Sequence, residues 1–167
     1  ACCTPTPLQW HVSAGWQRLA VALQDQQSVW PMALLSGLGA PWNTLQAEGR
    51  LQWNSTDLRL DWHAGQWHWQ GQSALQVHGL ASRLSTLRPM GSYHLTLQGS
   101  ESGTPTPSLS LATLEGPLRL SGQGQWLGQR LRFTGEAMAE PGHEDVLSNL
   151  LNIIGRRDGA RSLLSLG

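Results

Sequence analysis

Residues 143–166 read HEDVLSNLLNIIGRRDGARSLLSL and contain the clearest helical pattern in the chain. Apolar residues recur there at helical spacing, which predicts one amphipathic helix over about residues 143–154. Gly155 is expected to end the helix as a C-terminal glycine commonly does, and a short alternating run follows from Arg161 to Leu166. One helix after a long β-patterned chain must place its apolar face on a sheet. That face consists of Val146, Leu147, Leu150, Leu151 and Ile154.

Almost everything before this helix has the period of two that is typical of half-buried strands. Residues 45–53 are a clean example, because Leu45, Leu51 and Trp53 fall on one face and Gln, Glu and Arg fall on the other. Pro31 interrupts an apolar run and indicates an edge strand or a loop there. Leu80, Leu84 and Leu87 have near-helical spacing, which indicates a short helical crossover before Pro89. Turns are predicted at residues 13–15, 54–57, 64–65 and 127–130.

These turns predict registers that keep apolar residues together. A two-residue loop at 64–65 places Trp62 opposite Trp67 and Asp61 opposite His68. The loops at 54–57 and 127–130 are expected to have four residues each. They would place Trp53 opposite Leu58, Gly49 opposite Trp62, Trp126 opposite Leu131 and Gly124 opposite Phe133.

The fold class that follows is mainly β: a curved, twisted antiparallel sheet of about eight to ten strands with one C-terminal amphipathic helix. Strand glycines favour curling into a meander or half-barrel, which would leave an apolar trough that the helix fills in part. Residues 1–7 form an extended N-terminal segment because of Pro5 and Pro7. Residues 8–167 form a single domain.

Composition excludes several classes of function. The formal net charge is zero, with 11 basic and 11 acidic residues, which argues against binding to nucleic acid or a polybasic membrane patch. The sequence contains no run of 18 apolar residues, so it predicts no transmembrane helix. Cys2 and Cys3 are adjacent and cannot staple the fold. They belong to an untethered terminus, to an acylated cysteine beside a cleaved signal, or to an intermolecular disulfide.

Catalytic and metal-binding patterns are weak, and we expect neither an enzyme nor a cofactor. Asp61, His63 and His68 could be neighbours on one hairpin, but no established metal-ligand spacing supports a site. The sequence contains no Gly-x-Ser-x-Gly motif. Asn54-Ser55-Thr56 fits a glycosylation sequon, although a turn is the simpler interpretation.

The nine tryptophans offer a second line of inference, since four of them share one predicted face. Plain core packing is the first interpretation, and a platform for sugar or a groove for an acyl chain is the alternative. A small basic cluster after the helix, Arg156, Arg157 and Arg161, is a solvated helix end or a contact for a partner. The candidate groove consists of Trp53, Trp62, Trp67, Trp69, Leu120, Trp126 and Phe133.

Several segments together resemble the type II secretion system protein N family. Residues 148–162, SNLLNIIGRRDGARS, resemble the end of that family most specifically. Residues 39–45, 84–91 and 118–126 are similar to its inner segments, and the likeness spans roughly residues 30–167.

This resemblance implies a non-enzymatic accessory component of the machinery that exports folded proteins across the outer membrane of Gram-negative bacteria. It implies a periplasmic domain at the cell inner membrane, tethered there in the full-length protein, with other inner-membrane secretion proteins as partners. The family is also distantly similar to AsmA-like proteins, so phospholipid in an apolar groove is the alternative. The N-terminal anchor that the resemblance implies is missing from this sequence.

Overall fold

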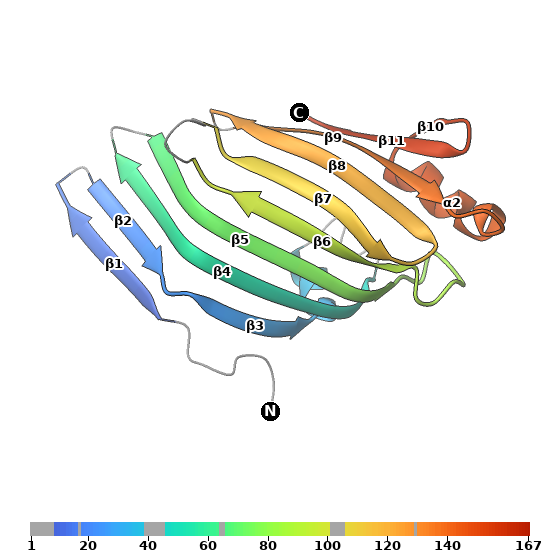
Figure 1. The fold of residues 1–167 in the computed structure, drawn as a ribbon, viewed down its shortest axis with the longest axis horizontal. Helices are drawn as coiled ribbons and strands as arrows, with labels where there is room; N and C mark the ends of the chain where they lie inside the picture. The colour runs from blue at the N-terminus through green and yellow to red at the C-terminus, as the bar shows by residue number, and fades with distance from the viewer. Residues whose placement is uncertain (1–8, 17, 39–45, 64–65, 101–105, 129) are drawn as a thin grey trace.

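One large antiparallel sheet and a C-terminal helix dominate the computed structural model, which describes residues 9–16, 18–38, 46–63, 66–100, 106–128 and 130–167 (Figure 1). The predicted segment 1–7 and the two cysteines lie outside the described residues. The strands are β1 (Trp10–Gly15), β2 (Arg18–Leu23), β3 (Gln26–Pro31), β4 (Glu48–His63), β5 (Gln66–Ala81), β6 (Gly91–Gln98), β7 (Ser108–Glu115), β8 (Leu118–Leu127), β9 (Arg130–Ala139), β10 (Arg156–Asp158) and β11 (Arg161–Leu166). The helices are a 3-10 helix η1 (Met32–Leu38) and an α-helix α2 (Glu144–Ile154).

The strand order is β1-β2-β4-β5-β6-β7-β8-β9-β11-β10, and β3 also pairs with β4. Every pairing is antiparallel, and the sheet is open, with β1 at one end and β10 at the other. Figure 1 shows the long strands β4 and β5 bending along their length. The predicted mainly β class with one C-terminal helix is therefore confirmed.

Two predicted hairpin registers are confirmed. Trp62 lies opposite Trp67 and Asp61 lies opposite His68 in the β4–β5 ladder. The β8–β9 ladder places Trp126 opposite Leu131 and Gly124 opposite Phe133. Parity was sufficient at both sites, because a slip by one residue would move apolar side chains to the solvent-exposed face. The four-residue loop predicted at 127–130 is wrong in length, since Leu127 and Arg130 already pair within the β8–β9 ladder.

The turn predicted at residues 54–57 is wrong, and so are the registers that depended on it. The chain instead continues as one 16-residue strand, β4, with a bulge in which Asp57 and Leu58 lie opposite Gly71 alone. Asp57 has a φ of 49° and Gly71 a φ of 89°, and a Cβ on Gly71 would collide with the Asp57 carbonyl. A bulge needs few residues and shifts parity by one, so a cluster of polar turn-forming residues can conceal it in the sequence.

Two smaller predictions also need correction. Residues 13–15 belong to β1 and do not form a turn. The segment 82–90 has no helix, because β5 extends to Ala81 and irregular turns follow, from which Leu84 and Leu87 pack into the core. Residues 32–38 form the 3-10 helix η1, which the sequence pattern did not predict. Pro31 does end a strand, β3, which pairs only with β4, so the edge-strand interpretation is confirmed.

The predicted helix is confirmed as α2, and it covers one end of the sheet. Leu147, Leu150 and Leu151 are buried in a cluster with Tyr93 and Leu118 of the strands. Val146 was placed on the same face but is 42 % exposed. Burial of three large aliphatic side chains contributes roughly 1.5–3 kcal/mol each to folding.

Gly155 ends α2 for a different reason from the predicted one. Its φ is −167°, which is ordinary extended backbone and not the left-handed conformation of a glycine cap. A Cβ at this position would lie 2.7 Å from Ser162 Oγ, so the glycine permits β11 to approach closely. The Ser162 hydroxyl then donates to the Leu151 carbonyl at 2.7 Å and satisfies one of the free carbonyls in the last turn.

Candidate functional site

An apolar cavity of about 310 Å³ lies between the sheet, η1 and α2. Met32 and Leu35 of η1 line it on one side, and Leu150 and Ile154 of α2 line it on another. Strands β4 to β8 supply the floor, which is where the sheet's apolar residues converge. Its remaining lining residues are Ala47, Leu51, Leu75, Val77, Leu80, Ser82, Met90, Tyr93, Leu95, Leu111, Leu118 and Leu120.

The only phenol of the chain, Tyr93, is part of this cavity wall. Its hydroxyl donates to the Leu118 carbonyl at 2.9 Å, and the side chain is 3 % exposed. Burial raises the pKa of Tyr93 well above its ordinary value, and the nearby Arg119 guanidinium opposes this only in part. The phenol therefore stays neutral and contributes an apolar ring to the cavity with its polar atom already paired.

Of the six predicted groove residues whose side chains the structure describes, Leu120 alone is among the lining residues of this cavity. Trp53 packs edge-on against Trp30, with ring centroids 6.5 Å apart, and its indole N–H donates to Ser73 Oγ at 2.6 Å. Trp69 packs edge-on against Trp126 on β8, at 5.7 Å. Their role as a ligand groove stays a prediction.

The remaining two members with described side chains also lie on the sheet. Trp62 is half-buried on β4. The ring of Phe133 covers the glycines of the neighbouring strand, so that a Cβ on Gly122 would collide with it. An aromatic ring over a strand glycine compensates for the missing side chain. The side chain of Trp67 lies outside the described part of the structure.

Sequence reasoning missed most of the cavity. It weighted the tryptophans because they are large, whereas the cavity is lined by aliphatic residues of the strands next to α2. The helical spacing of Leu150 and Ile154 was the available signal, since both were predicted to face the sheet. Nothing in the sequence pattern indicated that η1 would contribute Met32 and Leu35.

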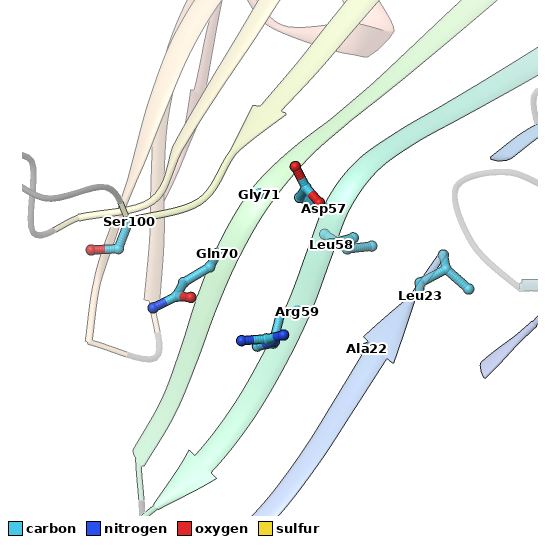
Figure 2. A pocket seen from close by; sticks show the side chains of 8 residues that line it. All are labelled: Ala22, Leu23, Asp57, Leu58, Arg59, Gln70, Gly71 and Ser100. Atoms are coloured by element: carbon cyan, nitrogen blue, oxygen red, sulfur yellow. The ribbon is translucent and has the colours of Figure 1, made fainter. Parts of the chain in front are cut away.

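A second, polar hollow of about 640 Å³ lies at the β4 bulge, lined by residues of β2, β4 and β5 and by Ser100 (Figure 2). Asp57 and Arg59 are its charged side chains, with Gln70 beside them. The Asp57 amide donates to Asp25 Oδ1 at 2.8 Å, which fixes the bulge to the β2–β3 connection. The hollow follows from the geometry of the bulge, and its lining suggests no acid–base or nucleophilic pair.

In the hairpin considered for metal binding, the Asp61 carboxylate forms an ion pair with an arginine. Asp61 lies 3.7 Å from Arg18 in an ion pair, and within the described residues no group of three or more His, Cys, Asp or Glu side chains could hold a metal ion. The side chain of His63 is outside the described part.

The predicted basic cluster forms one edge of the sheet. Arg156, Arg157 and Asp158 make up β10, and all three are exposed. Arg161 of β11 lies 3.5 Å from both Glu136 and Asp158 in ion pairs. Among the ion pairs of the described residues, Arg156 and Arg157 have none. The structure therefore separates the cluster into one paired arginine and two free ones.

Comparison with known proteins identifies the family. A family model described as type II secretion system (T2SS), protein N, matches residues 6–163. The chain belongs to the type II secretion system protein N family. It is therefore a component of type II secretion and of protein transport. No curated protein and no solved structure matches. Among the described residues, no helix has the length and apolar character needed to cross a membrane.

Proposed function

We propose that this chain is a periplasmic accessory component of type II secretion, held at the inner membrane, that acts by binding other inner-membrane secretion proteins and catalyses no reaction. Membership of the protein N family supports its place in the system. The mode of action is inferred from its surfaces, because the described hollows offer apolar lining or isolated charges and a sheet edge offers unpaired cations.

The contact surface in this proposal is the β10 edge. β10 pairs with β11 on one side only, so its other side offers unpaired backbone groups to an incoming strand or loop. Arg156 and Arg157 stand on this edge with exposed guanidinium groups, which suit bidentate pairing with carboxylates. We therefore expect an acidic segment of a secretion component to bind here. The unpaired arginine pair is the observation that carries the proposal.

Site-specific photocrosslinking in intact cells tests this contact. A photoreactive residue replacing Arg157 should crosslink to another secretion component, while the same residue at Ser121, which is exposed in the middle of β8, should not. Charge reversal at the neighbouring Arg156→Glu should reduce the Arg157 crosslink several-fold. Crosslinking of equal strength from both positions, or from neither, would overturn the proposal.

The apolar cavity supports a second candidate, the binding of an acyl chain. A cavity of about 310 Å³ could hold roughly ten waters by liquid volume, yet water in it would find few polar partners. The Tyr93 hydroxyl is already bonded, and the other residues are almost all aliphatic. Such cavities stay dry and bind apolar ligands. A single chain whose headgroup remains outside matches this chemistry.

Filling the cavity tests the second candidate. Leu95→Trp adds bulk at the cavity wall, whereas Leu114→Trp adds the same group at a position that is 51 % exposed. If the cavity binds an acyl chain, the first change should weaken binding of a fluorescent palmitate analogue at least tenfold and the second should leave it unchanged. Thermal unfolding of both variants serves as the folding control. Equal binding by both would remove the candidate, as would a wild-type protein that binds none.

A further inference from the structure

At the opposite edge of the sheet, β1, the structure defines which residues direct their backbone N–H and C=O groups away from β2. The backbone N–H of Gln24 donates to the backbone carbonyl of Gln9, with 3.3 Å between nitrogen and oxygen. Gln9 and Gln24 continue the register in which Val12 lies opposite Val21. Gln9 and Gln24 are therefore a hydrogen-bonded pair of the antiparallel ladder, and such pairs recur at every second residue. The odd-numbered residues of β1 direct their N–H and C=O groups to β2. Trp10, Val12 and Ala14 direct theirs outward.

This edge has none of the usual protection against strand addition. Natural edges are blunted by charges, prolines, bulges or very short strands. β1 has six residues, WHVSAG, with no formal charge or proline, and its register with β2 is unbroken. Val12 is 63 % exposed, and Trp16 in the adjoining turn is 96 % exposed. The β10 edge has only three residues, all charged.

Two copies of β1 can pair with each other as an antiparallel ladder, and one register is favourable. Residues whose backbone groups point outward must lie opposite each other, so even-numbered residues must pair with even-numbered ones. A two-fold axis between the two copies of Val12 achieves this, with Trp10 opposite Ala14 of the second copy. His11 then lies opposite Ser13 of the second copy as a non-hydrogen-bonded pair. No like charges meet, and a large residue faces a small one in both pairs.

We propose that β1 is a homodimerisation edge, through which a second copy of this chain extends the sheet in that register. Other even registers keep fewer of the outward residues paired, because the strand is only six residues long. The two-fold operation keeps the apolar faces of both sheets on the same side. Closed, isologous association of this kind is the commonest form of homodimer. In the same two-fold arrangement, the β10 edge would place the two copies of Arg157 opposite each other, which like-charge repulsion disfavours.

Heterologous disulfide formation tests the register directly. In a background with Cys2→Ser and Cys3→Ser, proteins with His11→Cys and with Ser13→Cys are purified separately, then mixed and oxidised. The mixture should form disulfide-linked dimers much faster than either protein alone, because only residues 11 and 13 lie opposite each other and non-hydrogen-bonded pairs have close Cα atoms. Equal rates in all three samples would overturn the register.

Sedimentation analysis tests the dimer itself. Val12→Pro removes an outward N–H without removing any donor from the β1–β2 ladder, and edge strands tolerate proline at such positions. We expect the wild type to dimerise with rising concentration, Val12→Thr to match it, and Val12→Pro to dimerise at least tenfold more weakly with an unchanged circular dichroism spectrum. A wild type that is monomeric at every concentration would overturn the proposal, as would a dimer that survives Val12→Pro.

Discussion

Tyr93 shows how one residue joins the core of this sheet to its cavity. It is buried where α2 meets the strands, and its hydroxyl is paired with the Leu118 carbonyl. Because burial raises its pKa, the folded protein holds a proton here that the unfolded chain releases at a lower pH. Folding stability linked to Tyr93 is therefore fully present below about pH 10, the ordinary tyrosine pKa, and falls as the pH rises above it.

Phenolate absorbance during an alkaline titration follows this linkage specifically, since the chain has one tyrosine. We expect phenolate absorbance to appear together with unfolding and not before it. Tyr93→Phe should cost about 1 kcal/mol at neutral pH through the lost hydrogen bond, and this deficit should shrink above about pH 10. A phenolate that titrates at the ordinary pKa in a folded protein would contradict this account of Tyr93.

The glycines mark the limit of residue-level prediction. Gly155 was correctly read as the end of a helix, but only the structure shows that it makes room for Ser162 and Leu163 of β11. Gly71 reads as an ordinary strand residue, yet its positive φ is what permits the β4 bulge. A close approach between two strands depends on tertiary packing, so the local sequence pattern does not predict it.

Elements with strong periodicity could be predicted, and those without it could not. The spacing of Leu147, Leu150 and Leu151 predicted α2 and its buried face, which the structure confirms. Alternation and short loops predicted the β4–β5 and β8–β9 hairpins. A bulge changes parity with one extra residue, so residues 54–57 were misread as a turn. The helix η1 is too short to have a period, and the cavity side that it forms was missed with it.

The edge strands β1 and β10 differ in a way that follows from their residues. β10 is short and charged, which disfavours pairing with itself and favours an acidic partner. β1 is longer and has no formal charge, which favours a second copy. Strand alternation in the sequence indicated that edges would exist. It did not indicate which strands would become edges, because strand order depends on long-range pairing.

At the scale of the whole molecule, the sheet is an open platform with two distinct ends and a cavity near α2. Binding at one edge leaves the other accessible, because β1 and β10 lie at opposite ends of the strand order. A dimer joined through β1 would present two β10 edges and two cavities. This arrangement suits an accessory component that holds other proteins in place.

The central claim is that this chain supports type II secretion through the arginines of β10, and a secretion assay tests it most directly. In a strain lacking the gene, the fraction of a type II substrate reaching the culture medium is compared after complementation with the wild-type protein or a variant. We predict several-fold lower secretion with Arg156→Glu/Arg157→Glu than with wild type. Arg130→Glu/Arg132→Glu makes the same charge change at exposed positions of β9, away from the edge, and should restore secretion fully. Full secretion with the β10 variant, present at a normal level, would contradict the account.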